Sequence, residues 1–315
     1  MSSKTLILLA ALTLITLVLG DSNRDYEDKM NRNIQLQASA YQVQINSIMN
    51  NPNSQGKRDK LKFELQADSG ELQIKMLYAN SSSNTQSTYK VKFRSIHEYI
   101  NDEFNTTNTV SSLYFTKYNP IVCVKQVFNT NTTMFNCTVS TSDNIFSVQM
   151  FFSSTILNTH SFSMKPTSAK FTVFITNYPY KAPKSQLALV AVVVSNKQTR
   201  EDSRSSENLS GFVPVPEKQV AFGRSVFFSW SLNATADGLE VPVNNQPLVS
   251  DPTDEPNAQK LVFTFGTSTQ AKNIVWDPKL GANANVTYSS ASSVKSTTVT
   301  FMFAILFSVV IFLLE

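Results

Sequence analysis

Apolar and polar residues alternate at period two in many segments of this chain, and this pattern constrains the fold more than any other feature. Side chains of a β-strand point alternately to the two faces of a sheet, so each such segment predicts a strand with one buried face. The clearest segments are centred on Phe63, Ile74, Val91, Val148, Val173 and Phe263. The continuous apolar run 187–194 predicts a strand that is covered on both faces.

Turns rich in Asn, Ser, Thr and Pro separate these segments, and only residues 98–104 suggest a helix, of one or two turns. About a dozen antiparallel strands at short spacing predict an all-β fold with a β-sandwich-like body over residues 21–282. Two packed sheets or two sub-domains both fit this pattern. The charged polar interval 195–211 is either a linker between two β domains or a long loop inside one. The short segment after it favours one composite unit.

The N-terminus is typical of a secretory signal peptide. Lys4 precedes an apolar run over 6–19, and Gly20 and Asp21 begin a polar sequence. We expect cleavage after Gly20, which makes residues 1–20 the signal peptide. A retained membrane anchor is the alternative, but a run of this length is short for a bilayer span of about 20 residues.

The C-terminus is typical of a signal for attachment of a glycosylphosphatidylinositol (GPI) lipid. Small residues and a polar spacer over 283–298 precede an apolar tail over 299–315 that would be removed. Ser289 and Ser290 are the leading attachment residues, and Asn283 lies at the other limit of the region. A transmembrane helix is the alternative, although the tail is short and no Lys or Arg follows it. The mature chain would then sit on the outer leaflet of the plasma membrane.

Potential N-glycosylation sites agree with a route to the cell surface. Asn-x-Ser/Thr sequons without Pro occur at Asn80, Asn105, Asn131, Asn136, Asn208, Asn233 and Asn285. We expect Asn80, Asn105 and Asn208 in polar loops, and Asn136 and Asn233 on the solvent face of strands. Asn285 lies so near the expected site of lipid attachment that we expect little glycosylation there.

Two cysteines, Cys123 and Cys137, each lie in an apolar strand pattern and are separated by a polar turn. Neighbouring antiparallel strands bring such residues within reach of a disulfide, which an oxidising compartment maintains. A redox pair or a metal site fits less well, because the spacing is not C-x-x-C and the chain has no further thiols.

A search for catalytic motifs finds no G-x-S-x-G, H-E-x-x-H, G-x-G-x-x-G or phosphate-binding loop. The chain has two histidines, His97 and His160, and we expect both in solvated turns. No cofactor motif is present, and 27 basic against 23 acidic residues give no basic stripe for nucleic acid. Two dispersed carboxylates of a glycosidase remain an alternative, since such acids need only spatial proximity.

Two loops contain groups suited to ligands. Asp251, Asp254 and Glu255 offer oxygen atoms for calcium, but they lack the glycine and regular spacing of an EF-hand, which favours a solvated loop without a metal. Tyr178 and Tyr180, in a loop with Pro179, are the candidate binding residues for a sugar or a protein. The alternative is that both tyrosines pack on the edge of the sheet. Trp230 is expected in the core.

The C-terminal third contains the segments 227–230 (FFSW), 263–266 (FTFG) and 275–281 (VWDPKLG). In these segments it resembles a group of secreted β-rich proteins that includes skeletal organic matrix proteins of corals. The chain lacks the acidic runs of the mineral-binding members, so mineral binding is not implied.

Together these patterns predict a GPI-anchored, N-glycosylated cell-surface protein without catalytic activity, acting in adhesion, recognition or coat formation. Its partners would be the outer leaflet of the membrane, through the lipid, and an unidentified extracellular protein or glycan. A surface-anchored hydrolase acting on glycans is the alternative.

Overall fold

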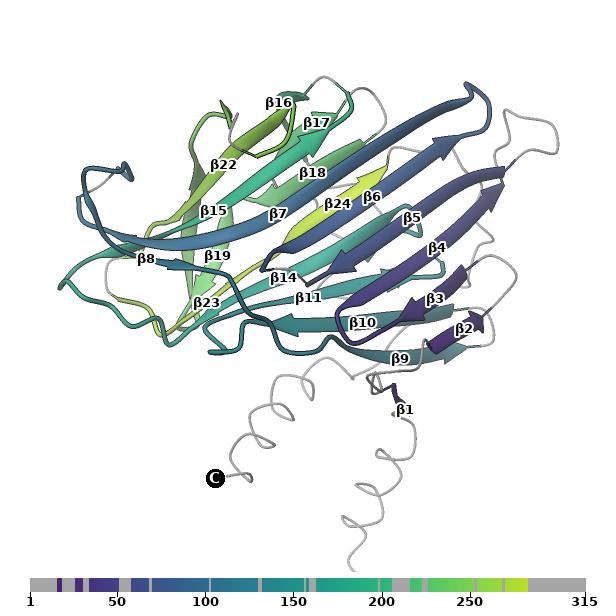
Figure 1. The fold of residues 1–315 in the computed structure, drawn as a ribbon, viewed down its shortest axis with the longest axis horizontal. Helices are drawn as coiled ribbons and strands as arrows, with labels where there is room; N and C mark the ends of the chain where they lie inside the picture. Colours follow the sequence, from purple (N-terminus) through teal and green to yellow (C-terminus); the bar gives the residue numbers. More distant parts are fainter. Residues whose placement is uncertain are drawn as a thin grey trace, which may run out of the picture.

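The computed structural model describes residues 16–18, 26–30, 34–50, 58–67, 70–101, 103–129, 132–155, 157–158, 163–197, 199–205, 216–222, 226–251, 254–267 and 270–282. These ranges contain strands β1 to β24 and no helix (Figure 1). None of the described segments therefore forms an apolar helix of membrane-spanning length. The all-β antiparallel prediction is confirmed, whereas the prediction of about a dozen strands was too low.

The strands lie in two layers (Figure 1). In the order of their pairing, the first layer contains β2 (Tyr26–Met30), β3 (Ile34–Ala38), β4 (Gln42–Asn50), β5 (Arg58–Gln66), β6 (Leu72–Asn80), β7 (Thr85–Tyr99), β15 (Gln186–Ser195) and β22 (Ala258–Phe265). Strand β8 (Thr109–Tyr114) pairs with β7, and β21 (Val249–Ser250) pairs with β22.

The second layer contains β1 (Thr16–Val18), β9 (Val122–Asn129), β10 (Thr132–Ser140), β11 (Phe146–Ser153), β14 (Ser168–Thr176), β24 (Pro278–Ala282), β18 (Val226–Ser231), β17 (Pro216–Phe222) and β16 (Thr199–Ser205). Strand β1 falls within the expected signal peptide, so its removal would leave β9 at the edge of this layer. A separate pair is formed by β12 (Leu157–Asn158) and β13 (Ser163–Met164).

Pairing is continuous from one layer to the other. Strand β23 (Asn273–Trp276) joins β14 to β19 (Asn233–Ala236), and β20 (Leu239–Asn245) pairs with both β19 and β22. The architecture is thus one nearly closed, barrel-like sheet rather than the two separate sheets of a sandwich. The correction follows from β20, whose short polar alternation gave no sign that it bridges the layers.

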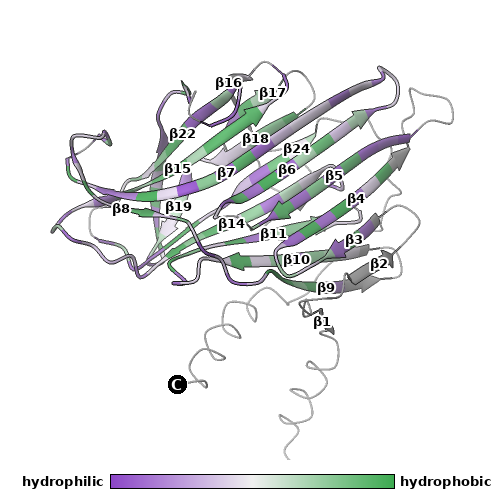
Figure 2. Cartoon of the chain, in the orientation of Figure 1, coloured by the Kyte–Doolittle hydropathy of each residue, from purple (hydrophilic) through white to green (hydrophobic). Residues whose placement is uncertain are grey.

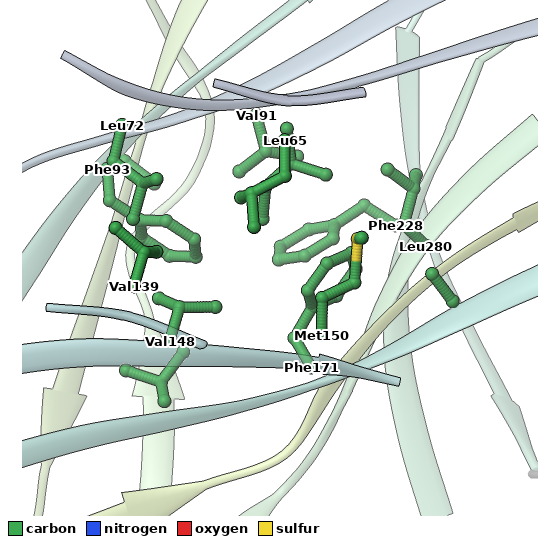
Figure 3. Close-up of a cluster of buried hydrophobic side chains, with 14 of the residues drawn as sticks. Leu65, Leu72, Val91, Phe93, Val139, Val148, Met150, Phe171, Phe228 and Leu280 are labelled. Carbon is green, nitrogen blue, oxygen red and sulfur yellow. The ribbon is translucent and has the colours of Figure 1, made fainter. Parts of the chain in front are cut away.

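The core lies between the two layers. Leu65, Leu72, Val91 and Phe93 of the first layer face Val139, Val148, Met150, Phe171, Phe228 and Leu280 of the second (Figure 3). Aromatic rings cross the same interface, with centroids 5.4 Å apart for Phe63 and Phe152 and 3.9 Å apart for Tyr89 and Phe222. Trp230 is buried here, as predicted. Residues on both sides of 195–211 belong to this single cluster, so that interval does not separate two cores in the described structure.

The burial of side chains along several strands follows the sequence pattern. In β6 buried and partly exposed residues alternate, as do those of β11 and β14 over most of their length, and the hydropathy of the ribbon alternates likewise (Figure 2). Nine consecutive residues of β15, from Leu187 to Ser195, are buried, which confirms the prediction of a strand covered on both faces.

The predicted disulfide is present. Cys123 of β9 and Cys137 of β10 are directly opposite each other in the ladder, with their Cα atoms 4.1 Å apart. Both side chains are buried in the main core.

We expect replacement of both cysteines by alanine to lower the free energy of unfolding by about 3 kcal/mol, the chain-entropy value for a loop of about 15 residues. The fold should survive, because β10 is also paired with β11. Urea unfolding of the purified protein measures the change, and reduced wild-type protein is the control. An unchanged midpoint would contradict a stabilising bridge.

Candidate functional site

Strand β7 carries the most extensive polar network of the described structure, because a bulge changes which of its residues face the core. Tyr89, Val91 and Phe93 face inward, and then the register with β15 shifts between Val190 and Ala191. Beyond the shift, Ile96 is in the core and Glu98 is opposite the inward Leu187. The helix expected over 98–104 is wrong, because residues 98 and 99 belong to β7 and the described residues that follow, 100–101 and 103–104, are not helical.

Glu98 has no solvent exposure and its carboxylate is surrounded by donors. Oε1 accepts hydrogen bonds from the backbone N–H groups of Lys181 and Ala182, both at 2.8 Å, and from Ser185 Oγ at 2.6 Å. Oε2 accepts from Ser111 Oγ at 2.6 Å and from the Lys181 N–H at 3.0 Å. The carboxylate thereby holds the loop between β14 and β15 against β7 and β8.

Burial of Glu98 opposes its ionisation, but these hydrogen bonds stabilise the charged form more, and the net effect lowers the pKa of the carboxyl group. All of the partners that Glu98 has in the described structure are donors from the protein itself. The arrangement suits a structural carboxylate that organises a loop. It does not suit a general acid, which needs a raised pKa.

The candidate binding residues Tyr178 and Tyr180 lie in this loop, but their rings are turned inward. Tyr178 is buried, its hydroxyl is 3.0 Å from Ser111 Oγ, and its ring meets that of Tyr180 edge to face. Tyr180 donates a hydrogen bond to the carbonyl of Ala271 at 3.1 Å. Burial raises the pKa of both phenols. The rings thus contribute to the attachment of the loop, and ligand binding by this loop stays a prediction.

His97 faces outward beside Glu98 and lies within β7, not in the turn that we expected. Ser95 Oγ is 2.8 Å from its Nε2, and Ser112 Oγ is 2.8 Å from its Nδ1. Burial, with a smaller contribution from Lys260, lowers the pKa of the imidazole. A neutral imidazole has one donor and one acceptor nitrogen, so one serine accepts and the other donates.

Around His97 lies what we call the β8 surface, made of His97, Val110, Ser112 and Tyr114. Strand β8 is an edge strand that pairs with β7 alone in the described residues, and Val110, Ser112 and Tyr114 are all exposed. Tyr114 is 64% exposed and its ring lies 5.8 Å from that of His97, edge to face. The surface therefore combines an aromatic ring, an aliphatic side chain and hydroxyl groups, which is suited to contact with a sugar or a peptide.

A second polar cluster holds residues 254–257 against the outer face of β7. Lys92 Nζ lies 2.8 Å from Asp254 Oδ1 and 2.8 Å from Glu255 Oε1, Lys90 also pairs with Glu255, and Arg94 pairs with Asp254. The side chains of Lys92 and Asp254 are only 5% and 6% exposed. The expectation of a solvated acidic loop is thus wrong, because the basic residues of a strand 160 positions away in sequence neutralise it.

Apolar residues on the outer face of the first layer are buried next to these ion pairs, since Val192 is opposite Lys92 and Val194 is opposite Lys90 in the ladder. Val192, Val194 and Ala258 form one buried cluster there, and Tyr99, Phe104, Ala188, Val190 and Val262 form another. Burial opposes the charged form of Lys92, but its hydrogen bonds to Asp254 and Glu255 outweigh this effect and raise its pKa, and the hydrogen bonds from Lys90 and Lys92 lower the pKa of Glu255. In the described residues no group of His, Cys, Asp or Glu is arranged to hold a metal ion.

Other predicted residues are placed as follows. Asn80, Asn105, Asn136 and Asn233 are in the described structure, in or next to β6, β8, β10 and β19. The remaining sequons Asn131, Asn208 and Asn285, the attachment candidates Asn283, Ser289 and Ser290, and His160 lie outside the described residues.

Comparisons with known proteins identify no family for this chain. No family model matches, and no curated protein matches. Among solved structures, the chain is similar to the Tris-bound glucosidase II alpha subunit (10% identity, TM-score 0.20, 86% of this chain and 32% of that chain) and to its Glc1Man2-bound form (11%, 0.20, 88% and 34%). The chain spans about a third of the length of these proteins. At this TM-score the likeness carries no argument about fold or activity, and the resemblance to skeletal matrix proteins stays a prediction.

We expect Glu98→Gln to lower the free energy of unfolding by about 3 kcal/mol at neutral pH, because the amide cannot accept from all the donors that the carboxylate satisfies. The lowered pKa fixes the pH dependence. The contribution of Glu98 is complete above its unfolded-state pKa of about 4.3 and is lost as the pH falls through the folded value. Urea unfolding from pH 7 down to pH 3 should show the two proteins converging. Exposed Glu103→Gln is the control, and a pH-independent difference would contradict the role of the charge.

For the second cluster, we expect Asp254→Asn to cost about 3 kcal/mol, because it leaves the buried ammonium group of Lys92 with less compensating charge. The matched control is Asp277→Asn, since Asp277 is 43% exposed and pairs with Lys170 at 3.2 Å, where the cost should be below about 1 kcal/mol. Replacing both partners, as Lys92→Met with Asp254→Leu, should restore most of the stability. Equal losses in the Asp254 and Asp277 variants would show that burial of the pair is not what matters.

Proposed function

We propose that this chain is a GPI-anchored, N-glycosylated cell-surface protein that acts in adhesion or recognition through the β8 surface. The observation that carries the proposal is the exposed Tyr114 on an edge strand, beside a histidine fixed by two serines. Exposed aromatic side chains of this kind are the residues that most often anchor protein contacts. The buried disulfide supports an extracellular location, because disulfides persist in oxidising compartments.

The terminal patterns supply the rest of the proposal. An N-terminal secretory signal and a C-terminal attachment signal over 283–315 would place the body outside the cell on a lipid. A lipid-held protein has no segment on the cytoplasmic side, so its effects would depend on partners in the membrane or on another cell. Coat formation is a variant of the same proposal in which the partner is a second copy or a glycan layer.

For the surface hydrolase, no observation on the described residues supplies support. Two carboxylates have no exposure: Glu98 accepts from donors of the loop between β14 and β15, and Asp59 accepts from Tyr78 and Ser81. Asp254 is occupied by Lys92 and Arg94. None of these carboxylates is presented to a substrate. We therefore propose a binding protein without catalytic activity.

The test uses the full chain expressed with both terminal signals in eukaryotic cells. A phosphatidylinositol-specific phospholipase should release the protein from the cell surface, under conditions that release a known GPI-anchored protein. Retention on the membrane in that experiment would overturn the anchor.

The released protein is then screened against glycans and cell-surface proteins. We expect Tyr114→Ala to weaken the binding that is found by about tenfold or more, because an aromatic anchor contributes about 2 kcal/mol. Leu239→Ala is the matched control, since Leu239 is also a large exposed apolar side chain, at 72%, on the hairpin between β19 and β20. Equal effects of the two variants would exclude the β8 surface as the binding site.

A further inference from the structure

The sequons of this chain differ in the setting of their Asn side chains, and this difference indicates which of them are glycosylated. N-glycosylation joins a large hydrophilic sugar to Asn Nδ2, so a folded protein tolerates it only where that nitrogen can reach water. The four described sequons begin at Asn80, Asn105, Asn136 and Asn233.

Asn80 and Asn105 share one local geometry. Asn105 Oδ1 accepts a hydrogen bond from the N–H of Thr107 at 2.9 Å and from its hydroxyl at 2.6 Å. Asn80 Oδ1 accepts from the N–H of Ser82 at 2.9 Å and from its hydroxyl at 2.7 Å. In both turns the third residue of the sequon donates hydrogen bonds to the amide oxygen of Asn. This is the Asx-turn, in which an Asn side chain bonds to the backbone two residues further on. The hydrogen bonds of these turns engage the amide oxygen and do not use Nδ2.

The environment of these nitrogens suits an attached sugar. Asn105 and its neighbours Thr106 and Thr107 are exposed in the segment between β7 and β8, while Ser82, Ser83 and Asn84 are exposed in the turn after Asn80. Asn80 itself is half-buried, and its Nδ2 donates a long hydrogen bond, of 3.4 Å, to the Tyr78 hydroxyl. A sugar would displace little at either residue.

Asn136 is presented in the opposite way. It lies in the middle of β10, between Val124 of β9 and Phe151 of β11. Its Oδ1 is buried and has no hydrogen-bond partner in the described residues. Phe151, directly opposite, packs against the buried Met134 and Met164. Asn136 lies on the outer face of β10, as expected, but it is half-buried, and a sugar on its Nδ2 would have to stand over this apolar outer cluster.

We infer that Asn80 and Asn105 carry N-linked glycans in the mature protein and that Asn136 does not. This inference rests on the proposed passage through a secretory compartment. In the step, Nδ2 attacks the anomeric carbon of an oligosaccharide carried on a polyisoprenyl pyrophosphate. The new C–N bond replaces the C–O bond to the carrier, the polyisoprenyl pyrophosphate leaves, and Nδ2 loses one proton. Asn233 is outside this assignment because its exposed Nδ2 donates to Glu240.

The two assigned sites flank β7, since Asn80 precedes it by one turn and Asn105 follows its last residue, Tyr99. Fifteen residues of strand separate its ends by about 45 Å. Tyr114 lies at the far end of β8 from Asn105, about 17 Å from Thr109 at its start. The glycans would therefore stand near the two ends of β7 and leave Tyr114 accessible.

The experiment uses the full chain secreted to the surface of eukaryotic cells. A peptide N-glycosidase in heavy-oxygen water converts each glycosylated Asn to labelled Asp, and mass spectrometry of the peptides locates the label. We expect label at Asn80 and Asn105 and none at Asn136. Label at Asn136, or its absence at Asn80 or Asn105 while other sequons are labelled, overturns the assignment and leaves the proposed function standing. Absence of label at every sequon overturns both.

Sequon variants supply an independent readout by gel mobility. Thr107→Ala and Ser82→Ala should each increase the gel mobility by the amount that loss of one glycan gives. The matched variants Thr107→Ser and Ser82→Thr preserve the sequons and should leave the mobility unchanged. Thr138→Ala, which destroys the Asn136 sequon, should leave the mobility unchanged. An increase in the gel mobility of Thr138→Ala, which would indicate the loss of a glycan, would contradict the assignment.

Discussion

Apolar contact between the inner faces of the two layers is the interaction on which the rest of the structure depends. Each strand offers every second side chain to that contact, so neither layer alone can remove its apolar face from water. Rings such as Phe63 and Phe152, or Phe93 and Phe146, meet across the interface. Because the inner faces fix how the strands sit, the polar residues of β7 acquire their positions from this packing and from the bulge opposite Val190 and Ala191.

Burial of β15 on both faces adds a second requirement. Its outer residues Val190, Val192 and Val194 need a cover that the opposite layer cannot supply. Residues 254–257 lie at the same outer face, where Lys92, opposite Val192, pairs with Asp254 and fixes their position. Removing a lysine and an aspartate from water costs free energy that their attraction only partly offsets, so the pair acts mainly to specify where the loop lies.

Sequence patterns predicted the parts of the structure that depend on local alternation. Strands such as β6, β11 and β14 follow from period two, and β15 follows from its unbroken apolar run. The barrel-like closure through β20 could not be predicted, because pairing partners are not encoded in the pattern of one strand. The role of Glu98 in holding the loop between β14 and β15 could not be predicted, because the bulge gives Phe93 and Ile96 a helical spacing. The pairing of Lys92 with Asp254 was hidden by their separation in the chain. Tyr114 and the loop tyrosines look alike in sequence, and only packing distinguishes the exposed ring of Tyr114 from the buried Tyr178 and the half-buried Tyr180.

The position of the β8 surface relative to the proposed anchor follows from the second layer. Ala282, the last described residue before the attachment region, donates its N–H to the carbonyl of Thr167, at the beginning of β14. Strand β14 then runs nine residues, about 30 Å, to Thr176, and the loop that follows brings Tyr178 to Ser111 of β8. A chain tethered after Ala282 would therefore hold its β8 surface at the end of the body away from the tether. That orientation suits a contact with a partner beyond the cell's own membrane, and it places the glycan inferred at Asn105 on the distal end and the one at Asn80 nearer the lipid.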